Sequence, residues 1–224
     1  MSNSNAGGKQ KGINQRLQVG DGGLLSVTGT TYSVTATGLT GSSGSFDDVV
    51  VGMRIDACGF TDNGDFEAYV VSKTATALVL SNVYNANGDK VTLSAESSGD
   101  SVELTFTRFY PVSEEQSLSF DNSPATEEST SKERKGQTTQ DVISYGLSFQ
   151  CSGKADFPDT NGLLRVKNAI NNVETVICRI VENSLGDIWE APFVITHSQS
   201  SEATQNIGYS VSGESAGLIK FMQV

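Results

Sequence analysis

The chain of 224 residues carries 15 Lys and Arg against 26 Asp and Glu, and 37% of its residues are hydrophobic. Its formal net charge is -11. This length accommodates one large β domain or two smaller ones, and the apolar content excludes a disordered chain. Charged residues, at 18%, are too few for a coiled coil. We expect a soluble protein without membrane partners, because no stretch reaches the roughly 18 apolar residues of a membrane helix and no signal peptide is evident.

Side chains that carry chemistry are scarce. Cys58, Cys151 and Cys178 form no CxxC pair, and His197 is the single histidine. A histidine-based nucleophile triad or a two-histidine metal site is hard to build from one imidazole. We therefore expect no catalytic residues, no metal and no cofactor, so that an enzyme is the least favoured class. Cys151 and Cys178 are predicted core residues and His197 a residue at a strand rim.

Charge divides the chain into three parts. Residues 1–18 hold Lys9, Lys11 and Arg16 and no acid. Residues 19–110 hold 4 basic against 11 acidic side chains and residues 111–224 hold 8 against 15, so each carries -7. The first part is a predicted flexible basic arm, because it cannot bury enough apolar surface to fold alone. The acidity of the other two argues against binding of nucleic acid, which requires Lys and Arg.

Alternation of apolar and polar residues predicts an all-β protein. The clearest case is Ile143 to Cys151, whose odd-numbered residues are apolar or aromatic. Predicted strands, in chain order, cover 24–28, 32–36, 49–57, 66–71, 77–80, 91–95, 102–106, 117–121, 143–151, 173–181, 188–196, 207–212 and 218–222. The 173–181 strand is expected to be buried on both faces, because Val173, Ile177 and Val181 fall on one face while apolar residues also occupy the other.

One segment has helical spacing instead. Leu163, Val166 and Ile170, joined by Ala169, predict a short amphipathic helix over 159–171, with Asp159 or Thr160 as its N-cap.

A domain boundary is expected near Pro111, where the composition changes. Residues 19–110 form a predicted small β-barrel or sandwich module, and residues 111–140 a long exposed loop or β-arm. This segment mixes both signs of charge, so it is either a solvated loop or an inter-subunit contact. Its charged candidates are Glu127, Glu128, Lys132, Arg134 and Lys135.

Four motifs in the second half of the chain carry a family resemblance. They are a TSK…G loop (Thr130 to Gly136), a strand that ends in Ser152-Gly153, a G-x-x-x-x-A strand (Gly186 to Ala191) and an S-x-S-G-x-S-x-G hairpin (Ser210 to Gly217). In this order they resemble the major tail protein, or tail-tube protein, of phages with long non-contractile tails.

The resemblance implies a tail-tube-type two-sheet β-sandwich or barrel with one helix over 111–224, preceded by the extra 19–110 module. It implies six-membered rings that stack into a tube, the conduit for DNA ejection in the virion tail, assembled in the host cytoplasm. The implied partners are further copies of the chain and the tape measure, tail terminator and distal tail proteins, with DNA passing unbound. Inter-subunit contacts would come from the basic arm and the 111–140 segment, and lumen acids from Glu174, Glu182 and Glu190.

The alternative is a pair of β-rich modules that bind carbohydrate or a cell surface. Such modules cluster exposed aromatic side chains, whereas most aromatic residues here fall at inward strand positions.

Overall fold

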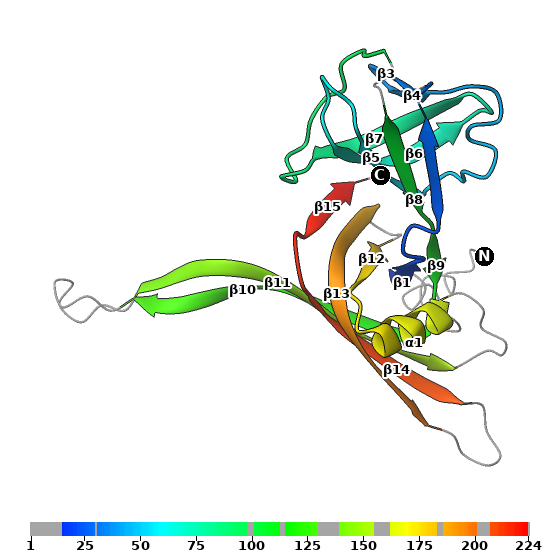
Figure 1. The fold of residues 1–224 in the computed structure, drawn as a ribbon. Helices are drawn as coiled ribbons and strands as arrows, with labels where there is room; N and C mark the ends of the chain where they lie inside the picture. Colours follow the sequence, from blue (N-terminus) through cyan, green and yellow to red (C-terminus); the bar gives the residue numbers. More distant parts are fainter. Residues whose placement is uncertain are drawn as a thin grey trace, which may run out of the picture. The chain divides into compact units, whose positions relative to one another are not determined.

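The computed structural model describes residues 15–29, 31–97, 101–112, 115–129, 139–154, 162–182, 186–200 and 207–223, with only the backbone at 124–129 and 139–145. The described chain is all-β with one helix, as the alternation predicts (Figure 1). That helix is too short and too polar to cross a membrane.

The chain divides into two compact units, Met1–Val19 with Pro111–Val224, and Gly20–Tyr110. The second unit is an insertion rather than a preceding module, because β1 (Gln15–Gly20) belongs to the sheet of the first unit. Its residues Gln15 to Val19 pair antiparallel with β12 (Val176–Glu182). Residues 15–18, which were expected to be part of the flexible arm, are therefore strand. The side chains of Leu17 and Val19 in this strand are fully buried.

The Gly20–Tyr110 unit is one antiparallel sheet of seven strands around its own core. The strand order is β2-β8-β5-β6-β7-β4-β3. The strands are β2 (Leu25–Gly29), β3 (Ser33–Thr35), β4 (Gly38–Thr40), β5 (Arg54–Cys58), β6 (Phe66–Lys73), β7 (Ala77–Asn85) and β8 (Val102–Thr107). Phe46, Ile55 and Phe106 are fully buried in the core. The predicted 91–95 strand is absent; its flanks form only isolated bridges at Lys90 and Glu96.

The other unit contains an eight-stranded antiparallel sheet and the helix. The strand order is β10-β11-β14-β13-β12-β1-β9, and β15 also pairs with β13. The remaining elements are β9 (Phe109–Pro111), β10 (Glu115–Ser129), β11 (Thr139–Lys154), α1 (Gly162–Asn172), β13 (Asp187–Ser200), β14 (Gly208–Ser215) and β15 (Lys220–Gln223). Of the 111–140 segment, residues 115–129 are strand β10, one side of a long hairpin.

Strand β13 joins two layers of this unit. Asp187 to Phe193 pair with β12, whereas Phe193 to Ser200 pair with β14. Residues of β11, β13 and β14 share one hydrophobic core with β1, β12 and α1. The sheet therefore folds over its own core, with α1 in the same core.

Helix α1 begins at Gly162 and buries Leu163, Val166 and Ala169, but Ile170 is 38% exposed against expectation. The candidate caps Asp159 and Thr160 lie outside the described residues. Val173 is not in a strand; it follows the helix at φ 57° and is 94% exposed. The carbonyl oxygen of Ala169 accepts a hydrogen bond from the Glu174 amide at 2.9 Å, and this bond closes the end of the helix. Strand β12 therefore begins only at Val176.

Candidate functional site

Four strands, β10, β11, β14 and β13, form a sheet whose two faces differ in chemistry. The core side carries apolar side chains such as Phe149, Cys151, Ile195 and Val211, all buried. Side chains alternate between the faces of a strand, so the residues between these point away from the core. Those residues are mostly serine.

The strand register arranges these outward side chains in three rows across the four strands. The rows run Asp121, Ser148, Glu214, Val194, then Ser119, Gln150, Ser212, Thr196, then Ser117, Ser152, Ser210, Ser198. We call this surface the serine-rich face. Hydroxyls bond along the rows: Ser117 with Ser152 at 2.6 Å, and Thr196 with Ser212 at 2.7 Å.

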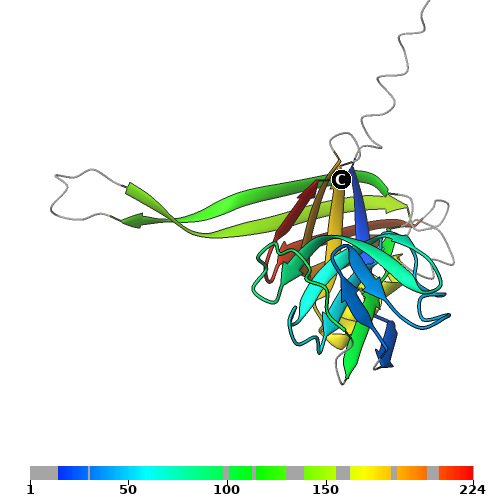
Figure 2. The same cartoon turned by 90° about the horizontal axis from the view of Figure 1, so that it is seen from above.

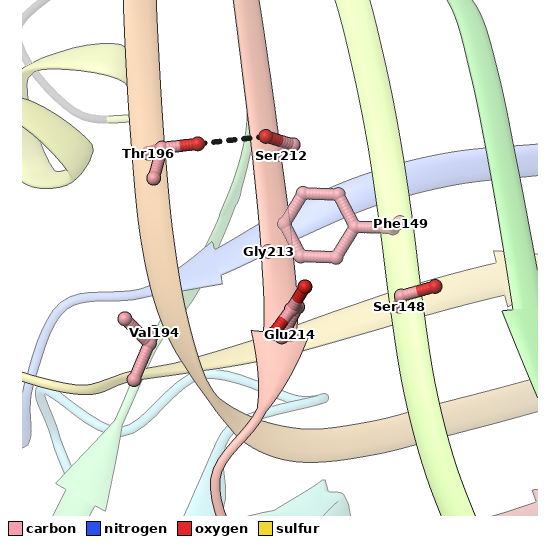
Figure 3. A pocket seen from close by; sticks show the side chains of 7 residues that line it. All are labelled: Ser148, Phe149, Val194, Thr196, Ser212, Gly213 and Glu214. Atoms are coloured by element: carbon pink, nitrogen blue, oxygen red, sulfur yellow. Dashed lines mark hydrogen bonds between the residues drawn. The ribbon is translucent and has the colours of Figure 1, made fainter.

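A hollow of about 310 Å³ lies on the serine-rich face (Figure 3). It is lined by Ser148, Phe149, Val194, Thr196, Ser212, Gly213 and Glu214. Its polar groups are hydroxyls and one carboxylate. Within the described ranges no three His, Cys, Asp or Glu side chains gather as a metal site. The face can therefore form hydrogen bonds to water or to a polar surface.

Among the strands that the structure describes, both outer strands of the four-stranded sheet have an open backbone edge. β10 lies at the end of the strand order with β11 as its one neighbour. Val194 to Ser200 of β13 pair with β14, and no other described strand pairs with this stretch. Open edges are templates for pairing with another chain. Because the four strands alternate in direction, β10 of one copy would meet β13 of an identically oriented copy antiparallel.

The β10–β11 hairpin extends beyond the rest of its sheet. β11 pairs with β14 from Ser148 onward, whereas its pairing with β10 continues to Ser129 opposite Thr139. Figures 1 and 2 show this two-stranded arm projecting from the unit. A two-stranded ribbon is marginally stable alone, so the arm is suited to contact another chain.

The predicted contact residues are spread over several parts of the chain. Lys9, Lys11, Lys132, Arg134 and Lys135 lie outside the described residues. Arg16 lies in β1 opposite Val181. Glu127 and Glu128 lie near the tip of the arm, opposite Asp141 and Gln140.

None of the three predicted lumen acids lies on the serine-rich face. Glu174 follows α1 and binds Arg165 at 2.9 Å, and this bond, from a cationic donor, lowers its pKa. Glu182 ends β12 and accepts a bond from Gln15. Glu190 is 1% exposed and binds Arg179 at 2.6 Å, so its charge is buried and compensated.

The acids on the face are Asp121 and Glu214, which the sequence interpretation missed. Alternation in β10 and β14 could have placed each on the polar side of its strand. Their shared row depends on which strands pair, and this is not encoded locally.

Cys151, Cys178 and His197 lie in β11, β12 and β13 of this unit. Cys151 and Cys178 are fully buried, as expected. Burial raises the pKa of Cys151 to about 12 and that of Cys178 as well, so both thiols stay protonated. His197 lies in β13, and burial together with nearby Lys167 lowers its pKa.

No family model and no curated protein matches the chain. One similar solved structure is described as the virion of a native gene transfer agent particle, with 18% identity, a TM-score of 0.44, and coverage of 51% of this chain and 88% of that chain. A second, the tail of an empty gene transfer agent particle with C6 symmetry, has 18% identity, a TM-score of 0.42, and coverage of 51% and 86%. At TM-scores below 0.5, these likenesses assign neither fold nor function.

Proposed function

We propose that the chain is a structural subunit of a phage-type tail tube, in which copies join edge to edge into rings. The observation that carries this proposal is the four-stranded sheet with an open edge on each side. An even number of alternating strands lets every copy present β13 antiparallel to β10 of the next. Such a heterologous contact closes into a ring when the rotation between copies permits.

The sequence resemblance supports the same assembly. It implies six copies in each ring, stacking of rings into a tube in the virion tail, and passage of DNA during ejection. Stacking would use the β10–β11 arm and the basic N-terminal residues. Tape measure, tail terminator and distal tail proteins would be its partners.

The described surface disfavours the carbohydrate-binding alternative. Among large hydrophobic side chains exposed in the described ranges, the one aromatic is Phe221, at 44%. Stacking on sugar rings calls for several such side chains in one cluster.

Cysteine cross-linking tests the joining of edges. In a Cys58→Ser background, one new cysteine is placed on β10 (Ser117→Cys or Ser119→Cys) and one on β13 (Thr196→Cys or Ser198→Cys). We expect at least one of the four pairs to give a disulfide-linked ladder up to the ring size seen by electron microscopy. The matched single-cysteine variants give no ladder. A monomeric protein without cross-links for any pair would refute the proposal.

A further inference from the structure

Among the described residues of this unit, one face of the four-stranded sheet is bare and the other is covered. The core side shares its hydrophobic cluster with α1, β12 and β1.

In a ring closed by this sheet, the covered face must turn outward because the second layer needs room. The chemistry of the bare face agrees. A face that packs against protein needs apolar side chains, yet of twelve positions in the three rows only Val194 is apolar, and it is 56% exposed.

We infer that the serine-rich face lines the channel, and that its negative charge is confined to one row. This inference rests on the proposed ring. Ring closure would repeat each row once per copy around the channel, with neighbouring rows about 7 Å apart along the strands. Asp121 and Glu214 belong to the first row. The other two rows contain only Ser, Thr and Gln.

This wall fits the passage of a hydrated polyanion, namely duplex nucleic acid. The three rows contain no Lys or Arg, the side chains that grip phosphates. Hydroxyls and the Gln150 amide hold water at the surface, while Asp121 and Glu214 repel phosphate. Lys154 comes two residues after Ser152 on β11, opposite Gly208, so this cation lies next to the third row.

Accessibility of a thiol on the face tests its location. Gln150 is exposed in the middle of β11, away from both edges, so Gln150→Cys in the Cys58→Ser background reports on the face. In dissociated subunits, two reagents should both label it: the small N-ethylmaleimide and a polyethylene glycol maleimide of about 5 kDa. The second reagent is roughly as large as a folded domain. In assembled tubes, we expect the small reagent to label and the large one to label at least tenfold more slowly. Equal labelling of tubes by the large reagent would overturn the inference while leaving the tube itself established.

Binding of short duplex DNA tests the chemistry. Wild-type tubes should retain none at low salt, where phosphate contacts are strongest. Tubes of Gln150→Lys with Ser152→Lys should retain DNA at least tenfold more, with the retention lost as salt rises. Salt-sensitive retention by wild-type tubes would overturn the inference. Failure of wild-type protein to form rings would instead refute the proposed function.

Discussion

Gly213 of β14 lies directly beneath the ring of Phe149 on β11. A Cβ added at Gly213 would be 2.5 Å from Phe149 Cε1. Phe149 also packs edge-on against Phe193, with 4.9 Å between ring centroids. The absent side chain therefore lets the aromatic pair fill the core behind the serine-rich face.

Gly213→Ala should lower the unfolding free energy by about 1–3 kcal/mol, because the added methyl must displace a ring in a packed core. Chemical denaturation monitored by fluorescence measures the change. Gly146→Ala is the matched control on β11, where the new Cβ would meet only Ser123 O at 3.9 Å. A Gly213→Ala variant as stable as this control would show that the ring moves freely.

The buried ion pair between Arg179 and Glu190 gives a second prediction. Glu190 lies opposite Arg179 on β12 and opposite Lys220 on β15, and all three side chains are buried. Glu190→Gln should destabilise the unit by about 3 kcal/mol, because two buried cations lose their neighbouring carboxylate. Glu174→Gln is the control: its exposed pair with Arg165 is screened by water, so the unfolding midpoint should not change. Equal effects of the two variants would contradict this role for Glu190.

Local patterns predicted the faces of strands but not their neighbours. The alternation over 143–151 places Leu147, Phe149 and Cys151 in the core as found. The pairing of β1 with β12 was missed because Leu17 and Val19 adjoin a polar basic segment. Only their partners on β12, Ile180 for Leu17 and Cys178 for Val19, make them strand.

The error at Val173 has a different cause. An apolar residue before an apolar run was taken as part of the strand, but it occupies the left-handed position that ends α1. Glycine is the usual residue there, so composition gave no signal of a helix end. Likewise the acidic row of the serine-rich face exists only through register, which joins Asp121, Ser148 and Glu214 across three strands.

Excision of the inserted unit should leave a folded protein. Leu17 O accepts a bond from the Val112 amide at 3.2 Å, so the two chain ends at the boundary lie side by side. Residues 20–110 can thus be replaced by a short Gly/Ser linker, and the remaining core cluster keeps all its members. We expect a cooperative thermal transition and tubes in electron microscopy. An aggregated or non-cooperative product would show that the first unit depends on the insertion.

Removal of residues 1–14 should separate ring formation from stacking. This deletion takes away Lys9 and Lys11 but keeps β1, whose first pair joins Gln15 with Glu182. The variant should fold with an unchanged midpoint and form single rings rather than tubes, counted by electron microscopy. Tubes of normal length from the deletion variant would exclude the N-terminal arm from stacking.

Charge reversal at Lys132, Arg134 and Lys135 should weaken stacking more at low salt than at high salt.

The single histidine predicts a pH dependence of stability. Burial lowers the pKa of His197, and the positive charge of Lys167 lowers it further. Lys167 is held over β13 by its bond to Gln199 at 3.1 Å. The unfolded chain therefore binds a proton, near the ordinary histidine pKa of about 6.5, more readily than the folded chain does.

The unfolding free energy should consequently fall as pH drops from 7.5 through 6.5, and level off once the folded-state histidine is protonated. Guanidinium unfolding at pH 7.5, 6.5 and 5.5 measures the slope. His197→Gln should reduce the slope, and Lys167→Met should reduce it partly because the desolvation remains. A slope that is identical in wild type and His197→Gln would assign the pH dependence to other groups.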